Sequence, residues 1–349
     1  MSKVTLETIA KKCGVSKGLV SLALAGEYGV SAKKRSDIVV AALQLGYDFQ
    51  RLRRRKNDDQ GRLIVVLVKT IDLQTDRFWP QIIKGIEREA AAIHARISVR
   101  SWSETADPMA LIPEILDAGC VGILIVSELP PERFEPLAAL RIPMVLIDGK
   151  QRADDHLDTV SVNNYAAMRL AVSELIRRGA KRLVFVGDVS HADSFNQRFL
   201  GFRDALAFHP GIEGVFLTQP AGPTSLTDCL DWDALCADLD HRSPTVYVCA
   251  NDFIAEFVYR AASASGRRIP EEVGVFGFDD ISSASTMIPP LSTVVVPKTA
   301  LGQKAVQVLL DRITDREAPY SRTELMAFPC WRDSVSDEKR RVRPSKESV

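Results

Sequence analysis

The chain has 349 residues, of which 46% are hydrophobic and 26% are charged, with a formal net charge of zero, so it is long enough for a full core and for one to three domains. Its longest apolar runs, such as residues 63–68, are too short to span a bilayer, and its first residues contain no apolar export signal. The six cysteines form no CxxC pair, which predicts buried, reduced thiols in a cytoplasmic protein.

The first 56 residues are strongly basic. They hold twelve Lys and Arg against four Asp and Glu, so the rest of the chain carries an equal excess of negative charge. A small basic segment on an acidic body predicts that this segment alone contacts a polyanion such as nucleic acid.

Two short helices joined by a tight turn are predicted close to the N-terminus. Thr5 is a suitable cap for the first helix, whose apolar residues follow the i, i+3, i+4, i+7 spacing of a buried stripe, and Gly14 ends it. Ser16 caps the second helix, over residues 17–25. The inward side of this helix is expected to hold Leu19, Val20 and Ala23, and its outward side Lys17, Gly18, Ser21 and Leu22.

A third helix is predicted from the cap Ser31 to Leu45, where Gly46 ends it. Helix, tight turn, helix and supporting helix together form a helix-turn-helix. In such a unit the second helix lies in the major groove of DNA while the first braces it on the backbone. A generic three-helix bundle with a solvated basic face is the alternative that composition and spacing leave open.

Residues 4–47 resemble the N-terminal domain of the lactose-repressor (LacI/GalR) family. The stretch VTLETIAKKCGVSKGLVSLAL follows the family pattern V-T-[IL]-x-x-[IV]-A-x-x-[AC]-G-V-S-x-x-T-V-S-x-x-L with one departure, and VSAKKR and LGY match later family segments. The resemblance implies base or phosphate contacts from the exposed side of the second helix and further contacts near the DNA backbone. The first set is Ser16, Lys17, Gly18 and Ser21, and the second is Thr5, Leu6, Ser31 and Tyr47.

The second helix departs from the family pattern at three positions. Leu19 replaces the usual Thr, Leu22 replaces a frequent Arg, and Ala25 replaces the usual Asn. Arg pairs bidentately with guanine, which discriminates against other bases by about 1–3 kcal/mol. Because Leu22 can only contact a thymine methyl group or pack, we expect an operator that differs from the usual family sequence, with an A·T pair at this position.

Residues 49–61 are predicted to be a hinge or linker. The family hinge is a short helix that pairs with its twin and wedges a leucine into the minor groove, which kinks the DNA. Here Phe49 replaces the usual Pro, Arg53 replaces a small Ala, and Lys56 replaces the wedge leucine. We therefore expect Lys56 to lie along phosphates or in the groove instead of unstacking a base step.

The basic run in the hinge has two interpretations. It either neutralises phosphates beside the helix-turn-helix or forms a solvated linker, as most charge runs do. We favour phosphate contacts because the run directly follows the DNA-binding segment. The residues concerned are Arg51, Arg53, Arg54, Arg55 and Lys56.

From residue 62 to about 334, short Val/Ile-rich runs alternate with amphipathic stretches, which predicts parallel sheets covered by helices on both faces. About 270 residues are too many for one modest sheet, so two lobes are expected. One helix is expected to run from Pro80 to about Ala95 and another to start at Asp107 and Pro108. The stronger strand candidates are 63–68, 121–126, 143–148, 182–187, 245–252 and 273–280, and the weaker ones are 95–101, 158–163, 214–218 and 291–296.

Polar residues cluster where the predicted strands end, which is where ligands bind in such sheets. Asp148, Asn251 and Asp279 follow strands, and Arg198 lies early in a predicted helix. Together these groups resemble a polyol or sugar site, to which Phe78 and Trp79 would add an aromatic face. Each polar residue could instead cap a helix, and the two aromatic residues could instead belong to the core.

The family resemblance extends to about residue 333 through the segments QRFLGF, CANDFIAE, EEVGVFGFDD and IPPLSTV. It implies a two-lobed, periplasmic-binding-protein-like sensor that works as a dimer and binds its effector between the lobes. Val296 stands where many members have Gln, and Lys298 is nearby, which favours an effector unlike a simple sugar, bearing a negative charge. The implied ligand contacts are Phe78, Asp148, Arg198, Asn251 and Asp279.

These patterns predict four segments: a helix-turn-helix domain at 1–48, a hinge at 49–61, a two-lobed α/β effector-sensing and dimerisation domain at 62–334, and a disordered tail at 335–349. The predicted function is a repressor that binds a pseudo-palindromic DNA operator as a homodimer, close to the nucleoid, under control of a sugar-like effector. The alternative is an effector-independent, architectural DNA-binding protein with an idle sensor cleft.

No enzyme is predicted. The sequence contains no GxSxG, HExxH or P-loop motif, and no GxGxxG follows a predicted strand. The five histidines form no group with metal-ligand spacing, so neither a metal nor a cofactor is expected, and no membrane partner is expected either. A periplasmic transport protein would share the body but would need an export signal and would lack the basic N-terminal segment.

Overall fold

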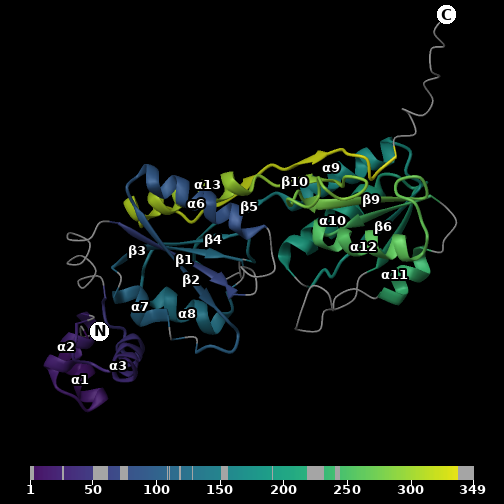
Figure 1. The fold of residues 1–349 in the computed structure, drawn as a ribbon. Helices are drawn as coiled ribbons and strands as arrows, with labels where there is room; N and C mark the ends of the chain where they lie inside the picture. Colours follow the sequence, from purple (N-terminus) through teal and green to yellow (C-terminus); the bar gives the residue numbers. More distant parts are fainter. Residues whose placement is uncertain are drawn as a thin grey trace, which may run out of the picture. The chain divides into compact units, whose positions relative to one another are not determined.

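The computed structural model describes residues 4–25, 27–49, 62–70, 78–107, 109, 111–117, 119–127, 129–150, 156–190, 192–217, 232–239 and 244–336. The chain forms two compact units. Figure 1 shows their helices and strands, with colours that follow the sequence. Unit 1 combines residues 1–161 with 298–323, and unit 2 combines 162–297 with the residues from 324 onward. Both units are therefore built from separate stretches of the chain.

Three helices form the N-terminal part of unit 1: α1 (Leu6–Cys13), α2 (Lys17–Ala25) and α3 (Ala32–Leu45). Their predicted caps are confirmed. The hydroxyl oxygens of Thr5, Ser16 and Ser31 accept hydrogen bonds from the backbone N–H three residues later, at 3.3, 3.2 and 3.4 Å. The glycines that end α1 and α3 have φ values of 65° and 76°, in the left-handed region that favours glycine.

The three helices share a small apolar core. Ile9 of α1, Val20 of α2 and Ile38 of α3 are almost completely buried. On α2 the buried side is Val20, Ala23 and Leu24, while Leu19 is only half-buried. Leu24 was not among the residues predicted to face inward. It lies four residues after Val20, on the same side of the helix, and is buried with it.

The larger part of unit 1 is built around a six-stranded sheet. The strand order is β11-β5-β4-β3-β1-β2, and the pairings β2–β1, β1–β3, β3–β4 and β4–β5 are parallel. The strands are β1 (Leu63–Lys69), β2 (Arg96–Trp102), β3 (Cys120–Val126), β4 (Met144–Ile147), β5 (Asp158–Val162) and β11 (Arg322–Leu325).

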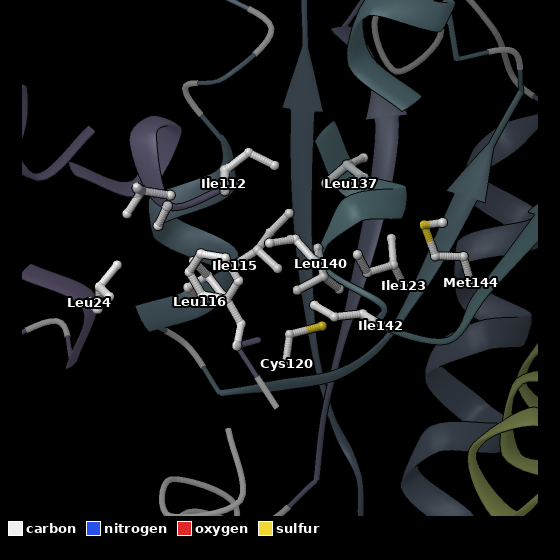
Figure 2. Close-up of a cluster of buried hydrophobic side chains, with 14 of the residues drawn as sticks. Leu24, Ile112, Ile115, Leu116, Cys120, Ile123, Leu137, Leu140, Ile142 and Met144 are labelled. Carbon is white, nitrogen blue, oxygen red and sulfur yellow. The ribbon is translucent and has the colours of Figure 1, made fainter. Parts of the chain in front are cut away.

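Helices cover both faces of this sheet, as expected for buried parallel strands (Figure 1). One face carries α6 (Trp79–Ala92) and α13 (Lys298–Thr314), and the other carries α7 (Leu111–Asp117) and α8 (Pro131–Ala139). Figure 2 shows Ile115 of α7 and Leu137 of α8 packed with Cys120 and Ile123 of β3 in a continuous apolar cluster.

Helices α6 and α13 approach each other through glycines. A Cβ atom added to Gly85 would lie 2.1 Å from the carbonyl oxygen of Thr299, and one added to Gly302 would lie 2.1 Å from that of Ile82. Any side chain at either position would therefore collide with backbone of the neighbouring helix. Only glycine allows this close crossing.

Unit 2 contains a second six-stranded sheet, in the order β12-β10-β9-β8-β6-β7, in which only β12 is antiparallel to its neighbour. The strands are β6 (Arg182–Val186), β7 (Glu213–Leu217), β8 (Thr245–Cys249), β9 (Val273–Asp279), β10 (Ser292–Val295) and β12 (Phe328–Cys330). The helices are α9 (Asn164–Arg177), α10 (Asp193–Ala207), α11 (Trp232–Leu239) and α12 (Asp252–Ala264).

The predicted α/β fold is confirmed, and all ten strand candidates form strands. Two helix boundaries were wrong. Helix α6 ends at Ala92 and not at Ala95, because His94 adopts a left-handed φ of 53° and the Ala95 N–H returns to the Ala90 carbonyl at 2.9 Å. Helix α7 begins at Leu111, because the Asp107 carboxylate accepts from the Met109 N–H at 2.9 Å and holds a turn there.

No helix among the described residues is both long and apolar enough to cross a membrane.

Candidate functional site: a DNA-binding surface and an effector-type cluster

The outward side of α2 is polar and small. Lys17, Gly18 and Ser21 are exposed, and Leu22 is half-buried beside them. Nothing lies within 4 Å of a Cβ atom placed on Gly18 except the Ser16 hydroxyl at 3.9 Å. The structure therefore brings these predicted DNA contacts together on one accessible face, where a flat partner can approach the backbone closely.

The N-termini of the three helices are accessible as well. Thr5, Ser16 and Ser31 are exposed and cap α1, α2 and α3. Neither α2 nor α3 has an acidic residue in its first turn, so the positive ends of their helix dipoles are not neutralised there. Helix N-termini of this kind bind phosphate oxygens.

Leu6 and Tyr47 are half-buried and so are less available than the capping residues. The Tyr47 ring contacts Phe49 edge-on, with 5.3 Å between ring centroids, and Phe49 is buried. Phe49, which the sequence assigned to the linker, is thus packed in this structure. The five basic hinge residues predicted to contact DNA, Arg51, Arg53, Arg54, Arg55 and Lys56, lie outside the described residues.

Unit 2 gathers three of the six predicted effector residues. The buried Arg198 guanidinium lies 3.2 Å from the Asp279 carboxylate and donates to Asn164 Oδ1 at 2.9 Å and to the Ala250 carbonyl at 2.7 Å. Its Cζ lies 3.8 Å above the Phe278 ring. The Nε and one Nη of the guanidinium donate these two hydrogen bonds, and the contact with Asp279 is an ion pair.

The side chains of Asn251 and Asp279 have different local roles. The Asn251 side-chain oxygen caps α12 by accepting from the Ile254 N–H at 2.9 Å, which is the capping role considered as its alternative. Asp279 ends β9 with a φ of 113°, an uncommon conformation for a residue other than glycine. Asp279 therefore faces Arg198 from a strained strand end and not from a helix cap.

Asp252 also follows a predicted strand, but the sequence analysis did not assign it to the effector site. This side chain is fully buried, and its two oxygens accept from Thr293 Oγ1 at 2.5 Å and from the Ile281 N–H at 2.9 Å. Burial and the nearby charge of Asp279 raise the pKa of Asp252 from 3.8 to about 8. The Asn-Asp pair directly after a predicted strand marked its position, but it did not predict that the side chain is buried.

The other three predicted effector residues belong to unit 1. Phe78 and Trp79 are both buried at the start of α6, with their rings 4.9 Å apart in an edge-on contact, as the core alternative anticipated. Lys298 Nζ lies 5.6 Å from the Phe78 ring. Asp148 is half-buried just after β4 with a left-handed φ of 51°.

Within the residues described above, no group of three His, Cys, Asp or Glu side chains could hold a metal ion.

Residues 172–335 match the family model of the periplasmic binding protein-like domain. The whole chain is similar to helix-turn-helix regulators. The transcriptional regulator MalR of Streptomyces coelicolor is 30% identical over 330 residues, which are 92% of this chain and 93% of that protein. The transcriptional repressor PurR of Pectobacterium atrosepticum is 26% identical over 343 residues, 95% of this chain and 97% of that protein.

Solved structures share the fold. The lac repressor dimer bound to operator superposes with a TM-score of 0.65 at 23% identity, covering 96% of this chain and 100% of that one. The complex of the regulator CelR with cellobiose gives a TM-score of 0.66 at 22% identity, covering 95% and 100%.

A basic helix-turn-helix on a two-unit, periplasmic-binding-protein-like body defines a DNA-binding transcription regulator. The chain belongs to the LacI family of helix-turn-helix transcriptional regulators. The predicted family is thereby confirmed, and at the level of the family its members are regulators and not enzymes.

Proposed function

We propose that this protein represses transcription by binding a pseudo-palindromic operator as a homodimer, and that a small sugar-like effector changes its affinity for the operator. The observation that carries the proposal is the exposed side of α2, where Lys17, Gly18 and Ser21 lie together near the capped N-terminus of this helix. The named relatives support it, because PurR is a repressor and the lac repressor structure is a dimer on its operator.

The DNA contacts are proposed from accessibility and charge. Phosphate contacts position a protein on the duplex, and base contacts select the sequence. The caps Thr5 and Ser31 and the side chain of Lys17 suit phosphates, while Gly18, Ser21 and Leu22 suit close approach to base edges. The domain boundaries at 48 and 61 and the basic hinge remain predictions.

The effector contacts are proposed from the cluster around Arg198. A planar guanidinium and a carboxylate held side by side offer donors and acceptors at fixed spacing, which is what neighbouring hydroxyl groups of a polyol require. The relatives support a sugar-like ligand, since CelR was solved with cellobiose and a LacI-family regulator of Enterococcus faecium with ribose.

Selection of bound duplexes from a random library tests the DNA-binding proposal. We expect one sequence with two related half-sites, bound at least about 10³-fold more tightly than random competitor at moderate salt. The substitution Gly18→Ala should weaken operator binding about tenfold or more, because the added methyl group occupies the closest-approach position. It should leave the fold as stable or more stable, by up to about 1 kcal/mol, because Ala favours a helix over Gly.

The matched control is Gly211→Ala, which adds the same methyl group at a position in unit 2 with nothing within 4 Å. It should bind the operator as the parent protein does. A protein that prefers no duplex over random competitor refutes the proposal. Full operator affinity in Gly18→Ala removes this side of α2 from the interface.

A further inference from the structure

The carboxyl ends of β1 and β2 carry a basic residue and a tryptophan side by side. Lys69 and Trp102 are the last residues of these strands and are register partners in the parallel pair. Strand β1 lies between β2 and β3, so the order of the sheet reverses at β1. Open α/β sheets bind ligands outside the carboxyl ends of their strands near such a reversal.

Trp102 has an unsatisfied donor at this place. Its side chain is 4% exposed, and its indole Nε1 is buried with no hydrogen-bond partner in the described part of the chain. Buried N–H groups are nearly always paired, because leaving one unpaired costs free energy. The indole N–H is therefore a free donor for an acceptor that the described residues do not supply.

Arg133, near the start of α8, contributes a buried charge to the same place. Its side chain is 4% exposed, and its Cζ lies 4.9 Å from the Trp102 ring. One guanidinium nitrogen donates to the carbonyls of Ser103 and Ala106, at 2.7 and 2.5 Å. No carboxylate among the described residues forms an ion pair with Arg133. A buried guanidinium without a counter-ion is unfavourable.

Lys69 completes the group. Its Nζ lies 5.8 Å from the Trp102 ring and 2.5 Å from the carboxylate of Glu104, which is largely exposed. The hydrogen bond and charge of Lys69, with a smaller effect of Arg133, lower the pKa of Glu104. This part of the surface therefore already favours a negative charge, and an exposed side chain such as Glu104 can be displaced by a better-fitting anion.

We propose that Lys69, Trp102 and Arg133 form an anion subsite at the carboxyl edge of the unit 1 sheet, which binds a phosphate or carboxylate group. This inference rests on the proposed function and narrows it to an effector that carries a phosphate or carboxylate group. The anion accepts from the indole N–H and from the two cations, and it gives Arg133 an ion-pair partner that the described residues do not provide.

Titration calorimetry of the full chain with inorganic phosphate and with acetate, at constant ionic strength, tests the subsite and separates the two acid groups. We expect saturable binding of at least one anion. Trp102→Phe keeps the ring and removes only the N–H, and Lys69→Met keeps the aliphatic stem and removes the charge. Each should weaken binding about tenfold or more, whereas Glu104→Gln, which removes the competing carboxylate, should strengthen it.

The matched control is Lys84→Met, at an exposed position on α6, which should bind anions as the parent does. The subsite is refuted if no saturable binding is found. It is also refuted if Trp102→Phe, Lys69→Met and Lys84→Met bind the anion equally well, because the anion is then bound by other basic groups. Operator binding is a separate readout. A protein that binds its operator but no anion loses this inference alone, and one that binds no operator loses the proposed function.

Discussion

Asp252 shows how one buried side chain can set the pH response of a whole unit. It is enclosed between α12, β9 and β10, and its oxygens accept from Thr293 and from the Ile281 backbone. Gly277 faces it so closely that an added Cβ would lie 2.1 Å from Asp252 Oδ1. With a pKa of about 8, the carboxyl group is protonated in the folded protein at neutral pH.

This protonation predicts that stability falls as pH rises. Between about pH 5 and pH 7 the folded protein retains a proton on Asp252 that the unfolded chain has lost, so the free energy of unfolding should fall by up to about 1.4 kcal/mol per pH unit. Above about pH 8 both states are ionised and this contribution stops changing. Urea unfolding of the parent and of Asp252→Asn across this range measures the slope.

Asp252→Asn should flatten the pH dependence, because an amide can accept from the Ile281 N–H and donate to Thr293 without titrating. Relative to the parent it should be most favourable at high pH. The matched control is Asp311→Asn, at an exposed position on α13. If Asp252→Asn keeps the slope of the parent protein, Asp252 is not the group that holds the proton.

At the scale of elements, the crossing of α6 and α13 holds unit 1 together. These helices meet through Gly85 and Gly302, whose added Cβ atoms would lie 2.1 Å from backbone oxygens of the other helix. Glu89 of α6 also accepts from Gln303 and Gln307 of α13, at 3.4 and 3.0 Å. The pair is therefore locked at one distance and one register.

Gly85→Ala should destabilise unit 1 by about 1–3 kcal/mol or more, because the methyl group can be accommodated only if the two helices separate. Thermal unfolding followed by circular dichroism measures the loss. Gly211→Ala introduces the same methyl group where nothing lies within 4 Å and should have little effect. A Gly85→Ala protein as stable as the parent would show that the helices move apart at no cost.

The sequence predicted the individual strands and helix ends better than it predicted which of them pack together. Continuous apolar runs predicted the strands, and Ser, Thr and Gly predicted the helix ends, because both signals are local. The pairing of α6 with α13 joins segments some two hundred residues apart, and no local pattern announces it. The Trp102 group and the buried role of Asp252 were missed for the same reason, since each depends on which residues the fold brings together.

The predicted effector residues show the same limit. Arg198 and Asp279 were recognised from strand ends and family segments, and they do form an ion pair. Sequence alone could not show that Arg198 is also bonded to Asn164 and to the Ala250 carbonyl. Replacing Arg198 by Ala would therefore leave buried groups unpaired, so a conservative change is the better probe of ligand binding.

At the scale of the whole molecule, the proposed regulation is a coupling between effector and operator. If an acidic sugar stabilises the protein in a thermal-shift screen, we expect it to change operator affinity about 5–150-fold, a coupling of about 1–3 kcal/mol. Thermodynamic linkage requires the operator to change ligand affinity by the same factor. Binding titrations of each partner in the presence of the other measure both.

Arg198→Lys should lose most of this response, because lysine keeps the charge beside Asp279 but not the planar fork of donors. Arg203→Lys changes an exposed arginine on the same helix and should respond as the parent does. A folded Arg198→Lys protein with the full response would exclude Arg198 from the effector site. A ligand that binds but leaves operator affinity unchanged would contradict the coupling itself.

The two-part construction of unit 1 has a consequence for how the protein is made. When the ribosome has finished residue 297, β1, β3 and β4 already exist, but α13 has not yet been synthesised. The nascent chain then lacks Leu309, which lies against Gly122 of β3, so an apolar sheet face is left bare until translation proceeds further. Truncation before residue 298 should accordingly yield a product that chaperones and proteases engage, even though every strand from β1 to β10 is present.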